Sequence, residues 1–174
     1  MARRGRGGRT HKELAGLGWH MVEDVDTGHG NYDHILVGSA GVYFLETKNL
    51  TGIVEIRDGK AWLRRRHDPE GERRLELQRQ VLGGSAKVFD EIERRCGQRV
   101  WVNGVVVLWS DFPQEVVEVD KITYVHGSKL RAWLSSQPDR LDPSAVASVA
   151  GVLAALKVEG DIAGERRTVA TAKA

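Results

Sequence analysis

The feature that most constrains the fold is a pair of short apolar stretches on either side of a glycine-flanked turn. Tyr32–Val37 and Val42–Lys48 are separated only by Gly38-Ser39-Ala40-Gly41. Glycines that flank a two-residue link are typical of a tight β-hairpin. We therefore expect two adjacent antiparallel strands with Ser39 and Ala40 at the turn.

This turn predicts which side chains share one side of the hairpin. Counting outward from it sets Asp33 opposite Glu46, and Lys48 projects to the same side as Glu46. Two directly opposed carboxylates destabilise a hairpin, whereas a shared divalent cation such as Mg²⁺ removes the conflict. Two carboxylates, a metal ion and a lysine can hydrolyse a phosphodiester bond, with Lys48 orienting the water or stabilising developing negative charge. The alternative is an ordinary surface aspartate beside a Glu–Lys ion pair.

A second hairpin is predicted around Asp58-Gly59, because both turn positions favour a positive φ. The expected register sets Arg57 opposite Lys60 and Glu55 opposite Trp62. One face of this hairpin is apolar and should be buried: Val54, Ile56, Ala61 and Leu63. The other face carries the candidate nucleic-acid-binding residues, which are Arg57, Lys60, Trp62 and Arg64. A solvent-facing strand or a homodimer surface would explain the same pattern.

The remaining periodicity predicts an α/β fold with a central mixed β-sheet flanked by helices. Further strands are expected at 20–25, 105–109 and 122–126, and helices at 72–96, 128–135 and 143–157. The 72–96 helix should bury one stripe: Leu75, Leu82, Ser85, Phe89, Ile92 and Cys96. We expect a basic flexible arm at 1–10, a single domain at 11–158 and a flexible tail at 159–174.

Composition limits the classes of protein to consider. The chain has 174 residues, a formal net charge of +2 and one cysteine, which fits a single globular domain in a reducing compartment, the cytoplasm by default. We expect no membrane-spanning run. Basic residues gather at 3–12 and 64–74, and such runs favour phosphate backbones.

The stretches Asn31–Gly38 and Gly41–Gly52 resemble the nuclease-related domain, a family of the PD-(D/E)xK restriction-endonuclease-like group. The resemblance runs from about Gly18 to Trp109. It implies a restriction-endonuclease-like core and a Mg²⁺- or Mn²⁺-dependent nuclease acting on DNA, with RNA as an alternative. It further implies roles for particular residues: Asp33, Glu46 and the Thr47 carbonyl as metal ligands, Lys48 as the catalytic lysine, and Gln80, or else Gln78, as an additional site residue.

One departure from the family pattern leaves other functions open. The family usually begins with a longer helix that carries a glutamate near the site, whereas Glu13 is the only acid near this N-terminus. A nucleic-acid-binding module without turnover, or an interaction domain that dimerises, would also fit such a chain.

Overall fold

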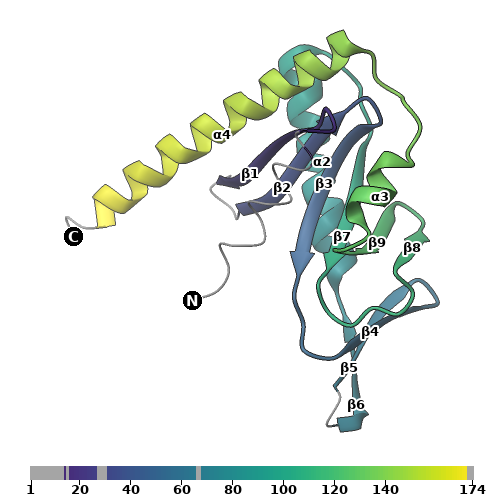
Figure 1. Ribbon diagram of the computed structural model, residues 1–174. Helices are drawn as coiled ribbons and strands as arrows, with labels where there is room; N and C mark the ends of the chain where they lie inside the picture. Colours follow the sequence, from purple (N-terminus) through teal and green to yellow (C-terminus); the bar gives the residue numbers. More distant parts are fainter. Residues whose placement is uncertain (1–13, 15, 27–30, 66–67, 172–174) are drawn as a thin grey trace. The chain divides into compact units, whose positions relative to one another are not determined.

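The computed structural model describes residues 14, 16–26, 31–65 and 68–171, without the side chains at 24, 26, 31–33, 68–70 and 162–171. Its elements (Figure 1) are β1 (His20–Asp26), β2 (Asn31–Gly38), β3 (Gly41–Lys48), β4 (Ile53–Arg57), β5 (Lys60–Arg65), β6 (Asp68–Leu75), α2 (Leu77–Cys96), β7 (Val102–Leu108), β8 (Val116–Val119), β9 (Ile122–His126), α3 (Leu130–Ser135) and α4 (Pro143–Thr171). The boundaries of β1, β2, β3, β7 and β9 agree with the predicted strands to within a few residues. β8 was not predicted.

The strands form two sheets. The larger one has the order β1-β2-β3-β7-β9-β8 and is mixed, because β7 and β9 are parallel whereas β1–β2 and β8–β9 are antiparallel. The smaller one has the order β4-β5-β6. The predicted class, a central mixed sheet flanked by helices in a restriction-endonuclease-like core, is confirmed.

The chain divides into two compact units, here called unit 1 (residues 1–42, 89–101 and 138–174) and unit 2 (residues 43–88 and 102–137). In unit 1, α4 packs on β1 and β2. Asp142 caps α4 by accepting a hydrogen bond from the Ala145 amide at 2.8 Å. The helix continues to Thr171 instead of ending at Lys157.

Unit 1 also contains the end of α2, from Phe89 to Cys96, which is tied to α4 by an ion pair. The Arg95 guanidinium donates to both carboxylate oxygens of Glu159, at 2.7 and 2.6 Å, and to Glu91 at 2.8 Å. The hydrogen bond from Arg95 lowers the pKa of Glu159. Cys96, expected to be a buried apolar residue, is only partly buried, and its thiol donates to the Ile92 carbonyl oxygen.

In unit 2, the first part of α2 lies against β3 and β7. A Cβ on Gly84 would collide with the Phe44 ring, and a Cβ on Gly104 would lie 2.5 Å from Val81 Cγ1. Two predictions about this helix are wrong. It begins at Leu77 instead of 72, because residues 68–75 pair with β5 as the strand β6. Leu82 is 40% exposed, and the buried stripe consists of Leu77, Val81, Ser85, Val88 and Ile92.

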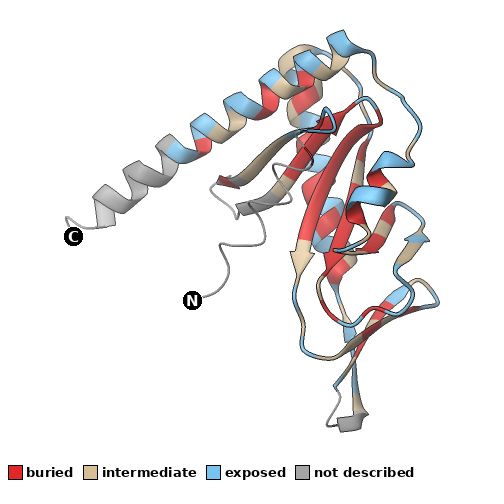
Figure 2. Ribbon diagram, viewed as in Figure 1, coloured by how far each residue is buried: buried red, intermediate tan, exposed pale blue. Residues whose placement is uncertain are grey.

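The small sheet of unit 2 confirms the predicted second hairpin. Asp58 and Gly59 have φ values of 48° and 71°, and the register sets Arg57 opposite Lys60 and Glu55 opposite Trp62. The apolar face is buried as expected (Figure 2) at Val54, Ile56, Ala61 and Leu63.

A side chain from the loop after β7 fixes the edge of this sheet. Gln114 accepts a hydrogen bond from the Ile56 amide at 2.6 Å and donates one to the Ile56 carbonyl at 3.0 Å. The Val54 amide donates to the Asp111 carbonyl at 2.8 Å. The three-stranded sheet is therefore held to the body of unit 2 by its β4 edge.

Among the described helices, the segment Pro143–Asp161 is long and apolar enough to cross a membrane by length and composition alone. It is longer than any apolar run expected from the sequence. Core helices of globular proteins meet the same criterion, so this finding carries no conclusion about a membrane.

Candidate active site

The end of β3 carries a buried carboxylate paired with a lysine. Glu46 is 3% exposed, and Lys48 Nζ lies 2.5 Å from Glu46 Oε1. The preceding β3 residues, Val42 to Leu45, are all buried, so the apolar strand draws Glu46 into the interior. Burying a charge is costly unless a partner offsets the loss of hydration. Lys48 supplies that partner here.

Strand alternation defines the side of β3 on which this pair projects. Phe44 packs at Gly84 of α2, and the Tyr43 ring meets Trp133 of α3 edge-on, with centroids 5.7 Å apart. Because successive side chains alternate, Glu46 and Lys48 project with Phe44 toward α2. The Lys48 carbonyl accepts a hydrogen bond from the Trp109 amide at 2.9 Å, which anchors this end of β3.

The two glutamines considered for the site lie on different sides of α2. Gln80 is one turn before Gly84, so it shares the side of the helix that meets β3, and it is exposed. Gln78 instead donates to the Gly59 carbonyl at 2.7 Å and lies close to Tyr124 of β9. Of the two, Gln80 is thus on the side nearer to the strand of Glu46.

Asp33 belongs to β2, the neighbour of β3 in the sheet order, and the connecting turn is at Ser39 and Ala40 as predicted. The Asp33 side chain lies outside the described part of the structure, so its position opposite Glu46 stays a prediction. Within the side chains that are described, no cluster of three His, Cys, Asp or Glu residues forms. The basic N-terminal arm and Glu13 also lie outside the described residues.

Other polar residues on the strands have identified partners. His34 Nε2 lies 3.2 Å from Glu23 Oε1 on the paired strand β1. Glu55 pairs with Arg64 at 3.6 Å. On the same face, the Arg57 guanidinium carbon lies 5.1 Å from the centroid of the Trp62 ring, and an Arg57 nitrogen lies 2.5 Å from a Glu72 oxygen. That hydrogen bond to Glu72 is the main reason that the pKa of Arg57 is raised.

Two features of unit 2 were missed by sequence reasoning. Gln114 clamps β4, but a lone glutamine in a loop carries no signal of such a role. The Tyr124 hydroxyl and the Ser85 hydroxyl are buried without a hydrogen bond among the described residues. Burial raises the pKa of Tyr124, and the nearby Gln78 opposes that shift.

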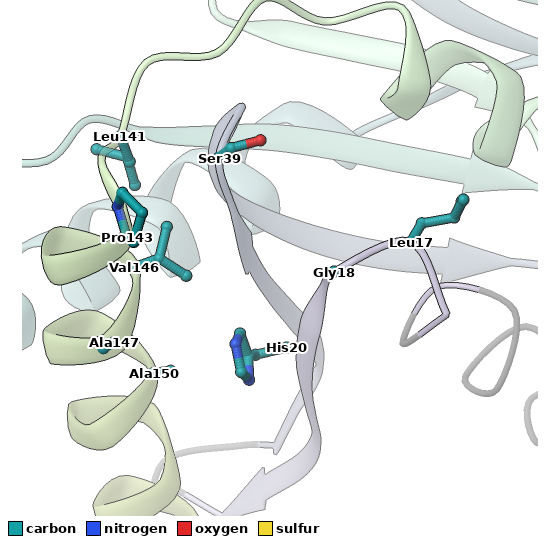
Figure 3. A pocket seen from close by; sticks show the side chains of 9 residues that line it. All are labelled: Leu17, Gly18, His20, Ser39, Leu141, Pro143, Val146, Ala147 and Ala150. Carbon is teal, nitrogen blue, oxygen red and sulfur yellow. The ribbon is translucent and has the colours of Figure 1, made fainter.

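A pocket of about 570 Å³ in unit 1 is a separate feature (Figure 3). It lies between the start of β1 and the first turns of α4. Its lining includes His20, Ser39 and Val146 but no carboxylate. His20 therefore faces this pocket, and the hydroxyl of the lining residue Ser39 donates a hydrogen bond to the Asp139 carboxylate at 2.5 Å.

The sequence model of the nuclease-related domain matches residues 7–109, which is more than half of the chain. The chain belongs to the nuclease-related domain family. The matched range includes the β2–β3 hairpin, Glu46, Lys48 and both glutamines of α2. No curated protein and no solved structure matches the chain. The family assignment indicates a nuclease-related function and a nucleic acid as substrate or partner.

Proposed function

We propose that this chain is a divalent-metal-dependent nuclease that hydrolyses phosphodiester bonds of DNA. The observation that carries the proposal is the Glu46 carboxylate, which is buried at the end of an apolar strand and paired with Lys48. A buried ion pair adds little net stability compared with apolar residues of similar size, so its presence at the end of a core strand favours a chemical role.

The donor set fits a hard divalent cation. Carboxylates and a backbone carbonyl are the oxygen ligands that Mg²⁺ and Mn²⁺ prefer. In the proposed site, Asp33, Glu46 and the Thr47 carbonyl hold the ion. When bound, the ion polarises the phosphate and lowers the pKa of a coordinated water.

The protein side chains perform the remaining tasks. Lys48 shares the side of β3 with Glu46, so its ammonium group orients the attacking water or stabilises negative charge that develops on the phosphate. Gln80 is proposed to contact the water or the phosphate from the β3 side of α2. The water oxygen bonds to phosphorus and releases a proton to solvent, and the bond from phosphorus to the leaving oxygen breaks. The leaving oxygen takes up a proton from solvent, so the strand is cut into a phosphate end and a hydroxyl end.

The test is cleavage of labelled single-stranded and duplex DNA with Mg²⁺, with Mn²⁺ and with a chelator. We expect cutting only with metal, and a loss of at least 100-fold, on the order of a missing charge-stabilising donor, in Asp33→Asn, Glu46→Gln and Lys48→Ala. Glu93→Gln, a surface change on α2, serves as the matched control. Undiminished cutting by the Asp33 and Lys48 variants, or cutting that survives chelation, would overturn the proposal.

A further inference from the structure

The polar face of the three-stranded sheet in unit 2 carries one tryptophan ring with several cationic side chains around it. This surface, called the wing face below, consists of Glu55, Arg57, Lys60, Trp62, Arg64, Glu72 and Arg74. Their membership follows from the register, because Trp62 is opposite both Glu55 and Arg74, whereas Arg64 is opposite Glu72. Opposed residues project to the same side of a sheet.

We infer that the wing face binds single-stranded DNA. With Glu76, which pairs with Arg74 at 3.0 Å, four cations stand against three carboxylates, so the face keeps a net positive charge that suits a phosphate backbone. Trp62 is only partly buried, and a base can stack on an exposed aromatic ring when it is unpaired. Bases in a duplex are already stacked and present only their edges, so the wing face favours the single strand over the duplex.

Arg57 contacts both Trp62 and Glu72 on the wing face when no DNA is bound. The Arg57 guanidinium lies over the Trp62 ring while it bonds to Glu72. Guanidinium groups also stack on aromatic rings, so Arg57 can itself contact a base that lies beside Trp62. The Glu72 carboxylate occupies a donor of Arg57 that a phosphate oxygen would take, so Glu72 competes with the DNA.

The wing face is within reach of the proposed cleavage site. Glu55, the cross-strand partner of Trp62, is seven residues beyond Lys48 and therefore lies within about 25 Å of it. A DNA strand with one phosphate per ~3.4 Å covers that distance in about seven nucleotides. Gln114 and Asp111 hold the β4 edge in unit 2, which also contains Glu46 and Lys48.

The inference rests on the proposed function only in taking DNA as the substrate. A binding assay in which a chelator removes the metal tests the wing face without cleavage, and so separates this inference from the proposed nuclease activity. The affinity of the full chain for a fluorescent 20-nucleotide single strand and for the same sequence as a duplex would be measured by anisotropy across a salt series. We expect the single strand to bind more tightly. Trp62→Ala should weaken its binding by roughly 5- to 150-fold, and Trp62→Phe should restore most of the affinity.

Charge variants give a second, independent test. Arg57→Ala and Lys60→Ala should each weaken binding and lower the salt slope by about 0.7 for each phosphate that the variant no longer neutralises. Glu72→Gln should bind the single strand roughly fivefold more tightly, as expected for the release of one exposed charge pair. Glu93→Gln makes the same change of charge on α2 and should have a smaller effect.

Several results would overturn the inference. These are unchanged single-strand binding by folded Trp62→Ala, equal effects of Glu72→Gln and Glu93→Gln, or a wild-type preference for the duplex. If Trp62→Ala does not fold, unchanged binding by the exposed-residue variants Arg57→Ala and Lys60→Ala decides against it. If such results come with undiminished DNA cleavage, only the proposed role of the wing face is rejected. If binding depends on the wing face but no cleavage occurs, the proposed nuclease activity is rejected and the role of the wing face is retained.

Discussion

Replacing Lys48 with methionine should expose the free-energy cost of the buried Glu46 carboxylate. Removing one partner of a fully buried ion pair costs about 3–5 kcal/mol, because the other charge stays desolvated. Glu46 is 3% exposed, but the Lys48 side chain is 27% exposed, so water can partly replace the ammonium group. We therefore expect Lys48→Met to lower the free energy of unfolding by about 2–3 kcal/mol.

The assay is urea and thermal unfolding followed by circular dichroism, without metal. For a chain of this size the change corresponds to a midpoint lower by about 4–12 °C. The double variant Glu46→Leu with Lys48→Met should recover most of the stability, because it leaves no buried charge. A double variant as unstable as Lys48→Met would refute the reasoning.

Three further predictions follow from contacts in unit 2. Gly84→Ala should lower the free energy of unfolding in urea by about 1–3 kcal/mol, because the added Cβ would meet the Phe44 ring. Gly83→Ala, where an added Cβ meets nothing within 4 Å, should raise the free energy of unfolding by about 0.4–1 kcal/mol. Equal effects of the two variants would contradict this packing. Gln80→Ala should slow metal-dependent DNA cleavage. Gln78→Ala should lower the unfolding midpoint and leave the cleavage rate unchanged, because Gln78 bonds to the Gly59 carbonyl. The reverse result would assign the site role to Gln78 and the structural role to Gln80. Gln114→Ala should cost about 1–3 kcal/mol for its two hydrogen bonds. Because Gln114 holds the sheet that carries the wing face, the variant should also raise KM for DNA more than it lowers kcat, and an unchanged KM would contradict this.

The parts of the fold that sequence predicted well depend on strong local rules. Asp58 and Gly59 adopt the positive φ that the turn requires, and this alone fixes the register of β4 with β5. The Ser39-Ala40 turn is likewise set by local residues. The uninterrupted apolar strand Val105–Leu108 is buried on both faces as its composition indicates.

The errors arose where distant contacts override local preference. Residues 72–75 have no helix-breaking residue and continue into α2, yet they form β6 because they pair with β5. Leu82 is a stronger hydrophobe than Gly84, but the missing Cβ at Gly84 lets α2 approach Phe44, which turns Leu82 outward. The end of α4 was placed too early because polarity after Lys157 was taken as a sign of a tail.

For the candidate site, the sequence predicted the types of residue better than their surroundings. The Glu46–Lys48 pair was expected from spacing in one strand, and the structure adds the burial of the carboxylate. The difference between Gln78 and Gln80 could not be read from the helix alone, because it depends on which strand each side of α2 meets.

The central claim is that one divalent cation is held by Asp33 and Glu46 with Lys48 beside it. The most direct measurement is anomalous scattering from Mn²⁺ in crystals of the wild-type chain and of Glu46→Gln. The account predicts a single strong peak at about 2.0–2.2 Å from a carboxylate oxygen of each acid, and no such peak in the variant. A peak bound elsewhere, or Asp33 and Glu46 carboxylates too far apart to touch the same ion, would contradict it.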